Sequence, residues 1–426
     1  MKCKILLIAT LLLNLNSYAA VESIMLGDVN TREAKVWVKA KANSQIEVKI
    51  KELPEFVAQN QADEFGIAKF AITNLSPDTT YTYTVTDSEG TEEATLKTLG
   101  EFSKNTNTSF SVAILGRNFV KDELDTEEQA SDEDYDIYDQ VLKLNPLCVI
   151  WANGIDTLRE GDYTSKSTYY TRFIHSRKHE KLQSLLRGTS NIGVMAIDNY
   201  GPERADATMY NKEIAQDAFM NFWANPTFGN SKATSNAMYT QFRINDAEFF
   251  VVDDCSFRDN FEYKNKKRSF LSTSQVNVLV QALFASDAKF KVIVMNTAIA
   301  NPNETYDNYS DAKSEKATLF ERIEGLKIKG VLCVTGNKEY SEVTKMIRSS
   351  AYPIYDITAG PVTAKIATSS EELNYFKVPE SQIFKKTFTI LNFSGEEANR
   401  VLNIGFVDSK GALQFKHTIP LSEISE

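Results

Sequence analysis

Histidine is scarce in this sequence, which has only His175, His179 and His417 among its 426 residues. Transition-metal centres usually depend on imidazole ligands, so a histidine-rich centre is excluded. His175 and His179 are four residues apart and could share a helix face as a ligand pair. No acidic or cysteine partner stands at ligand spacing, and the pair falls in a basic segment, residues 173–181. We therefore interpret both as residues near the start of a surface helix, without a metal-binding role.

Cysteine is also sparse, and no serine-nucleophile motif of the Gly-x-Ser-x-Gly type is present. Beyond Cys3, the chain has Cys148, Cys255 and Cys333, and their spacing does not decide whether any of them form a disulfide. Cys255 follows two acidic residues, which disfavour a reactive thiolate. A serine or cysteine nucleophile is therefore unsupported.

Positive charge and long apolar runs are lacking too. The formal net charge is -10, which argues against nonspecific binding to nucleic acid or anionic membranes. The apolar run Ile5–Leu13 is too short to span a bilayer, and no comparable stretch follows. Lys2 and Lys4 precede this run and small residues end it at Ala19, so residues 1–19 read as a signal peptide. The sequence thus predicts an exported, soluble protein of the periplasm, the cell surface or the medium, without a lipid anchor at Cys3.

With 426 residues, the chain is long enough for a main domain of at least 250 residues with an appendage, and its 42% of apolar residues is typical of a globular protein. Segments 35–39, 45–50 and 81–85 alternate polar and apolar residues, so residues 20–100 are predicted to form a small fibronectin-like β-sandwich. The polar stretch Glu101–Asn107 is interpreted as a linker. Residues 108–426 then form the second predicted domain, in which strands alternate with helices, as in a layered α/β fold.

The second domain contains eight apolar segments that predict strands and three amphipathic segments that predict helices. The expected strands are 110–115, 148–151, 192–196, 248–252, 290–295, 330–335, 388–393 and 401–406, and the expected helices are 212–223, 272–286 and 314–325. The last two strands are expected to close the sheet layers rather than to form a separate domain.

The segment from Cys148 to Asp162 is a short apolar strand that runs into a polar loop, the usual place for a ligand site in an α/β sheet. It resembles the Trp-Leu-Gly-Asp-Asn-x-Tyr-Leu-Arg-Glu motif of the PhoD-like alkaline phosphatase and phosphodiesterase family, within the metallophosphatase superfamily. Trp151 and the Leu158-Arg159-Glu160 run keep their places. The metal-bridging Asp corresponds to Gly154 and the metal-binding Asn to Ile155, and neither side chain can bind a cation.

Scaffold positions of the family also recur, including segments 211–229, 249–259, 275–291 and 352–358. The resemblance implies a layered metallophosphatase-type β-sandwich flanked by helices, preceded by the small sandwich. It also implies which positions carried the family's two-metal phosphoester hydrolysis, in which carboxylates bridge two cations and His or Asn complete the coordination.

Those chemical positions have changed. The family's Gly-Ser-Cys motif corresponds to Gly116-Arg117-Asn118, and its Trp-Asp-Asp-His-Asp-Tyr-Gly motif corresponds to residues 195–201, where Asp198 replaces the His and Asn199 the last Asp. Its Ser-Gly-Asp-Arg-His-His-Thr-Glu motif corresponds to residues 335–342, and the Arg after the central strand is Cys255. The positions that we assign to the altered cleft are Asn118, Asn153, Gly154, Ile155, Asp198, Asn199, Cys255, Asn337, Lys338 and Glu339.

We therefore predict a pseudoenzyme without catalytic residues, resident metal or cofactor, which acts as a binding or assembly subunit with other protein chains at the cell envelope. One alternative is an active phosphomonoesterase or phosphodiesterase with a rebuilt all-oxygen Ca²⁺ or Mg²⁺ site, in which Asp198 and Glu339 are joined by Asn118, Asn153, Asn199 and Asn337. Arg117 and Lys338 would oppose a cation there. The other alternative uses these two cations to bind an anion without hydrolysis.

The acidic run between Asp122 and Asp134 could also bind Ca²⁺, but its spacing fits no EF-hand loop. We interpret it as a solvated loop that leads into a helix at residues 138–144.

Overall fold

The computed structural model describes residues 21–102, 108–123, 125, 130–229, 236–262, 267–349 and 351–425. The predicted signal peptide, residues 1–19, lies outside the described residues, as do most of the predicted linker and residues 124 and 126–129 of the acidic run.

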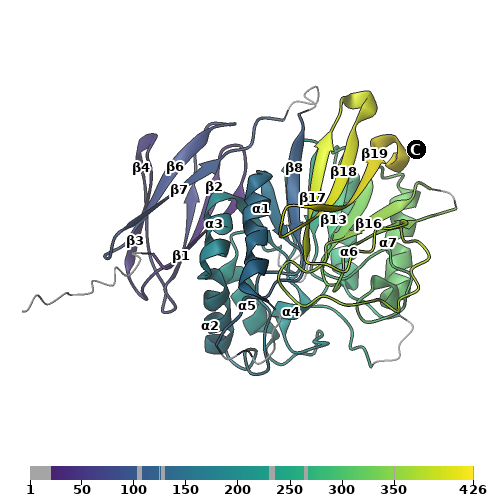
Figure 1. Ribbon diagram of the computed structural model, residues 1–426, viewed down its shortest axis with the longest axis horizontal. Helices are drawn as coiled ribbons and strands as arrows, with labels where there is room; N and C mark the ends of the chain where they lie inside the picture. Colours follow the sequence, from purple (N-terminus) through teal and green to yellow (C-terminus); the bar gives the residue numbers. More distant parts are fainter. Residues whose placement is uncertain are drawn as a thin grey trace, which may run out of the picture.

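The N-terminal part contains two antiparallel sheets that enclose one core, in the manner of a β-sandwich (Figure 1). In their order within the sheets, the strands are β1 (Ser23–Val29), β2 (Ala34–Lys39) and β5 (Ile67–Ile72), then β4 (Leu53–Gln61), β3 (Gln45–Ile50), β6 (Thr80–Thr86) and β7 (Thr91–Lys97). Alternate residues such as Val36, Val48 and Tyr83 point inward and are fully buried. The period-two segments 35–39, 45–50 and 81–85 correspond to β2, β3 and β6, as predicted.

The rest of the chain forms a layered α/β structure with two six-stranded sheets. The first has the order β10 (Ser190–Gly193), β9 (Cys148–Trp151), β8 (Phe110–Leu115), β17 (Thr387–Ser394), β18 (Val401–Asp408) and β19 (Leu413–Pro420). The second has the order β11 (Thr240–Ile244), β12 (Ala247–Val251), β13 (Phe290–Val294), β14 (Val331–Thr335), β16 (Ile354–Thr358) and β15 (Glu342–Met346). One buried cluster contains apolar side chains from both sheets, so they pack face to face.

Helices cover the outer faces of both sheets (Figure 1). On one side lie α1 (Ile137–Lys143), α2 (Lys166–Arg177), α3 (Glu180–Gly188), α4 (Ile197–Tyr200) and α5 (Lys212–Phe222), and on the other α6 (Ser272–Ala285) and α7 (Lys313–Gly325). Short 3-10 helices are η1 (Asp132–Asp136), η2 (Tyr309–Ala312), η3 (Glu397–Asn399) and η4 (Leu421–Ile424). This architecture confirms the predicted layered fold. No helix of the described ranges is both long and apolar enough to cross a bilayer.

Strand β10 is shorter than the predicted strand 192–196. It ends at Gly193, and the following residues leave the sheet to enter α4. A Cβ at Gly193 would lie 2.2 Å from Cδ2 of Trp223, so glycine lets this indole lie directly against the strand. The predicted C-terminal strands are β17 and β18, and they belong to the first sheet rather than to a separate domain, as predicted. There β17 pairs antiparallel with both β8 and β18.

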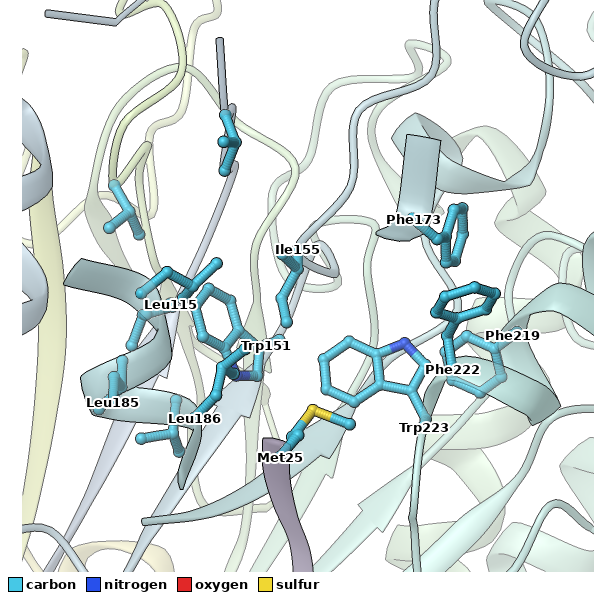
Figure 2. Close-up of a cluster of buried hydrophobic side chains, with 14 of the residues drawn as sticks. Met25, Leu115, Trp151, Ile155, Phe173, Leu185, Leu186, Phe219, Phe222 and Trp223 are labelled. Carbon is cyan, nitrogen blue, oxygen red and sulfur yellow. The ribbon is translucent and has the colours of Figure 1, made fainter. Parts of the chain in front are cut away.

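The N-terminal sandwich packs on the first sheet through β1. Asn191 Nδ2 donates to the carbonyl of Leu26 at 3.0 Å, and Ser190 Oγ donates to that of Gly27 at 2.9 Å. Met25 belongs to the same buried cluster as Trp151 and Trp223, and Figure 2 shows these side chains together. The two parts are therefore joined by an apolar interface as well as by the chain.

Candidate functional site

A cleft of about 550 Å³ opens where the loops after β8, β9, β10 and β14 meet. Ligand sites of α/β sheets commonly lie at such strand ends. Among the residues that line it, Leu158, Ile197 and Tyr306 are apolar or aromatic, and the others that matter here are charged or amide side chains: Arg117, Asp198, Arg204, Asp307, Asn337, Lys338, Glu339 and Glu372. We call this cavity the sheet-end cleft.

Arg117 lies between two carboxylates in this cleft. Its Nε donates to Asp198 Oδ2 at 2.9 Å, and its Nη1 donates to Glu339 Oε1 at 3.0 Å. The exposed fractions of the side chains are 24% for Arg117, 17% for Asp198 and 39% for Glu339. The charge of Asp198 is the main reason why the pKa of Arg117 is raised further above its ordinary value. The guanidinium group of Arg117, which is always charged, thus bridges the two acidic side chains of the altered motifs.

Asp198 is also held from its other side by a chain of amides. Asn153 Nδ2 donates to Asp198 Oδ2 at 2.8 Å, and Asn296 Nδ2 donates to Asn153 Oδ1 at 2.5 Å. Asn296, which follows β13, accepts a hydrogen bond from the backbone N–H of Ile197 at 3.1 Å. The carboxylate is therefore fixed in place by the scaffold and neutralised by Arg117.

Lys338 is likewise paired with a carboxylate of the same chain. Its Nζ donates to Glu372 Oε1 at 2.6 Å, and Tyr340 and Asn301 donate to Glu372 Oε2 at 3.1 and 2.7 Å. Burial, the largest single effect, would raise the pKa of Glu372, but Lys338 together with the hydrogen bonds from Tyr340 and Asn301 outweighs it, and the net shift is downward. The cation expected to repel a metal or attract an anion is thus paired within the chain.

Asn118 belongs to the scaffold behind the cleft. Its side chain is buried, donates from Nδ2 to the carbonyl of Ile155 at 2.7 Å, and accepts at Oδ1 from Tyr138 at 2.6 Å and Thr363 at 3.1 Å. These bonds use its amide to join the loops after β8 and β9, so Asn118 does not meet Asp198 in an oxygen cluster.

Gly154 and Asn199 are packed against each other. Gly154 has a φ of +70°, and a Cβ built there would lie 1.9 Å from Asn199 Nδ2. Asn199 accepts from the backbone N–H of Ala196 at 3.2 Å and so helps to cap α4. The position of the family's bridging Asp is consequently too tight for any side chain without rearrangement.

Ile155 and Cys255 are both fully buried in the apolar cluster below the cleft. Burial is the main cause of the strongly raised pKa of the Cys255 thiol, with the neighbouring carboxylates of Asp254 and Asp253 adding to it. Cys148, Cys255 and Cys333 are all free and buried. The thiol of Cys255 is therefore protonated and inaccessible, as its neighbours in the sequence suggested.

The two histidines lie on different elements. Helix α2 ends at Arg177 and His179 precedes α3, so His175 and His179 do not share the helix face that their spacing would have allowed. His175 Nε2 lies 2.9 Å from the carbonyl of Lys121, and His179 packs on Tyr135 with ring centroids 4.0 Å apart. The break between the two helices explains the difference.

The acidic run was wrongly interpreted as a solvated loop in its first part. Asp125 Oδ1 lies 3.4 Å from Arg159, and Asp125 Oδ2 lies 3.7 Å from Arg172, whose side chain is fully buried. Asp122 lies 3.2 Å from Arg159. These carboxylates neutralise two arginines that the sequence pattern did not connect with them. The predicted helix that follows is present as α1.

The residues present do not fit the two-cation centre that the resemblance implies. Carboxylates that bridge two cations are absent at positions 154, 196 and 197, and the guanidinium of Arg117 lies where Asp198 and Glu339 would need to converge on an ion. Within the described ranges, no group of three or more His, Cys, Asp or Glu side chains is arranged to hold a metal ion. Asn337 alone of the cleft amides has both polar side-chain atoms without a hydrogen-bond partner in the described structure.

Of the ten positions assigned from the sequence, Asp198, Asn337, Lys338 and Glu339 line the cleft. Asn153 does not line the cleft but hydrogen-bonds to Asp198, which does. The other five positions lie behind the cleft. Sequence reasoning missed Glu372, Arg204 and Tyr306. Glu372 is 34 residues from its partner Lys338 in a segment without regular structure, so no periodicity or motif could have connected them.

Comparison with known proteins gives consistent results. A family model described as PhoD-like phosphatase matches residues 166–410, and no curated protein matches. The solved structure titled "Structure of PhoD" is 14% identical, with a TM-score of 0.75 over 95% of this chain and 90% of that chain. The purple acid phosphatase PPD1 from yellow lupin (Lupinus luteus) is 12% identical, with a TM-score of 0.66 over 93% of this chain and 74% of that chain. At these identities, the structural likenesses show the fold.

Proposed function

This chain belongs to the PhoD-like phosphatase family, and we propose that it is a catalytically inactive member, a pseudoenzyme that serves as a binding or assembly subunit. The observation that carries the proposal is the position of Arg117, whose guanidinium bridges Asp198 and Glu339 at 2.9 and 3.0 Å. Phosphoester hydrolysis in this family is metal-dependent. An internal cation that neutralises the remaining carboxylates removes their attraction for metal ions.

The altered positions support the proposal together. Reintroducing one ligand would not rebuild the centre, since a side chain at Gly154 collides with Asn199 and Ile155 is part of the apolar core. The residues that remain in the cleft instead bind one another: Arg117 holds Asp198, and Lys338 holds Glu372. Their role is to keep the cleft in one shape, which suits a binding surface.

The wider setting is also part of the proposal. The pattern of residues 1–19 supports export by a signal peptide to the periplasm, the cell surface or the medium. We further propose two domains, a fibronectin-like sandwich at 20–100 and a metallophosphatase-type domain at 108–426 that includes the C-terminal strands. Protein chains at the cell envelope are the proposed partners, and the acidic net charge of -10 disfavours nucleic acid.

A second candidate is an anion-binding module without hydrolysis. It is favoured by unused donors in the cleft: a guanidinium carries five N–H donors, and Arg117 uses some of them on Asp198 and Glu339, while both amide atoms of Asn337 are without partners among the described residues. The rebuilt Ca²⁺ or Mg²⁺ site has weaker support, because Asn118 and Asn199 are engaged elsewhere.

The test combines the metal content of the purified full-length protein with hydrolysis of an aryl phosphate monoester and diester in the presence of Ca²⁺, Mn²⁺ or Fe³⁺. The pseudoenzyme proposal expects substoichiometric metal and no metal-dependent turnover. Stoichiometric metal with turnover that is lost in Asp198→Ala would contradict it and establish a replaced ligand set. Stabilisation of the fold by phosphate, without turnover, that is lost in Arg117→Met would favour the anion-binding candidate.

A further inference from the structure

A second cavity lies away from the sheet-end cleft, beside α7, the helix on the outer face of the second sheet (Figure 1). It encloses about 530 Å³, a volume typical of small-molecule sites. Its wall comes from α7, the loop after β13, the end of β15 and the segment around Tyr375. We call it the α7 pocket.

Lys316 is the distinctive residue of this pocket. It points from α7 toward the loop after β13, where its Nζ donates to Ser310 Oγ at 2.7 Å and to the carbonyl of Asn301 at 3.4 Å. Both acceptors are neutral. Within the described part of the chain, no carboxylate lies within ion-pair distance of this ammonium group, although charged groups with little access to water are normally paired.

Most of the other charged groups around Lys316 have partners of their own. Asp356 of β16 accepts backbone N–H groups of Ile299 and Ala300 at 2.7 and 2.8 Å, and at its other oxygen the hydroxyl of Thr335 at 3.2 Å. At the rim, Lys313 pairs with Glu304 at 2.8 Å, and Arg348 lies 3.8 Å from Glu324. Glu321 lines the pocket with an exposed side chain, and the buried Cys333 lies behind Lys316.

The lack of a charged partner has a measurable consequence. Burial lowers the pKa of Lys316 to about 8, against a weaker opposing effect of Asp356. An anion beside Nζ would raise this pKa again, so the amine takes up a proton on binding at a pH near or above 8, where part of it is neutral.

Beside these charged groups, the pocket wall has an apolar part. Phe320 and Met346 lie in or against the core beneath it, whereas Ile347 and Tyr375 are 60% and 76% exposed. Tyr375 packs on Phe376, with ring centroids 4.5 Å apart. Large apolar side chains that remain exposed around a cavity commonly mark a ligand site.

We propose that the α7 pocket binds a small monocarboxylate with an aromatic or branched aliphatic body, with the carboxylate on Lys316 Nζ and the body against Ile347, Tyr375 and Phe376. Among the described residues that line the pocket, Lys316 is the positive group without a carboxylate partner, and the apolar part of the wall supplies the remaining contact area. This site is separate from the sheet-end cleft and does not depend on whether the cleft is active.

The proposal is tested by calorimetric titration of phenylacetate and of its neutral isostere phenylacetamide into the full-length protein at pH 7. Phenylacetate is expected to bind at least about tenfold more tightly, because only the carboxylate forms a charge-assisted hydrogen bond with Lys316. Its affinity is expected to fall as the pH rises above about 8, where the amine loses its proton, with proton uptake visible as a buffer-dependent heat.

Two lysine variants on the same helix complete the test. Lys316→Met is expected to remove the preference for the acid over the amide, whereas Lys313→Met, at the rim and paired with Glu304, is expected to keep it. Equal affinities for acid and amide in the unmodified protein would overturn the proposal without reference to any variant. Equal losses in the two lysine variants would also overturn it, because they would place the carboxylate at the rim.

Discussion

Two arginine–carboxylate networks flank the loop that follows β9, and they serve different purposes. On the core side, Arg177 Nη1 donates to both oxygens of Asp156 at 3.0 and 2.8 Å, and both side chains are fully buried. On the cleft side, Arg117 pairs with Asp198 and Glu339, which remain partly exposed. The chemistry is the same, but the solvent access differs.

The difference shows what each network does for the molecule. The guanidinium of Arg177 lies over the rings of Trp37, Phe173, Phe222 and Trp223 at 5.1 to 5.7 Å, so it joins the sandwich to the helices. Arg117 makes no such aromatic contacts among the described residues and lies in an open cavity. We infer that the first network maintains the fold, while the second fills the cleft formed by the loops that carry the family's motif positions.

The largest expected effect comes from breaking the buried pair. Arg177→Met leaves Asp156 buried without its counter-charge, so we expect the free energy of unfolding to fall by about 3–5 kcal/mol. Denaturant unfolding measures this change. The control is Lys178→Met, because Lys178 pairs with Glu22 at the surface and its loss should cost less than about 1 kcal/mol. Similar losses in both variants would contradict the distinction.

Gly154 lies between the two networks, and its replacement tests how tightly they are joined. Gly154→Ala places a methyl group against Asn199 at a positive φ, and we expect a loss of about 1–3 kcal/mol in thermal or denaturant unfolding. Gly161 is a matched control in the same loop, with a φ of +95° but open space around a Cβ. Gly161→Ala should therefore show only the cost of placing an alanine at a positive φ. An equal loss of stability in both variants would mean that the Asn199 side chain moves aside at no cost.

Asp28 extends the comparison to a carboxylate without an arginine. Burial raises its pKa to about 6, and no hydrogen bond to its carboxylate is found within the described residues. The folded-state pKa of Asp28 lies above the ordinary value of 3.8. The contribution of the protonated carboxyl to the stability of the fold is therefore fully present below pH 3.8 and is lost as the pH rises through 6. Asp28→Asn should therefore be more stable than the unmodified protein by about 1–3 kcal/mol at pH 8.

The same substitution should give little gain at about pH 3.5, where the carboxyl is mostly protonated in both states. Melting temperatures across this pH range provide the measurement. A gain that does not depend on pH would show that removal of the charge is not its cause.

The smallest effect on stability is expected in the cleft. Arg117→Met leaves Asp198 and Glu339 partly solvated, so the free energy of unfolding should change by no more than about 1 kcal/mol at neutral pH. Chemical denaturation measures it against the Arg177→Met variant. A loss as large as that of Arg177→Met would mean that the cleft network also maintains the fold.

The sequence predicted the scaffold well because its signals are local. The strands predicted at 110–115 and 148–151 coincide with β8 and β9, because a short apolar run bounded by polar loops is typical of a buried strand. The predicted strand 192–196 was too long because it continued into the turn before α4. The family resemblance was confirmed by the family match and by the fold.

The contacts of the cleft could not be predicted, because they join distant loops. Arg117 was expected to oppose a cation, but its pairing with Asp198 and Glu339 spans 81 and 222 residues. No pattern in the sequence shows that Asn118 turns toward Ile155 and Tyr138 instead of the cleft. Side-chain direction in irregular loops depends on tertiary packing, which local propensity does not encode.

Calorimetric titration of Mn²⁺ into the full-length protein, with Arg117→Met in parallel, tests the central claim most directly. If Arg117 has taken the place of the metal ions, the unmodified protein should give no saturable heat, and the variant, with Asp198 and Glu339 released, should bind Mn²⁺ more strongly than the unmodified protein does. Stoichiometric binding of one or two ions to the unmodified protein, with an affinity no lower than that of Arg117→Met, would contradict the account.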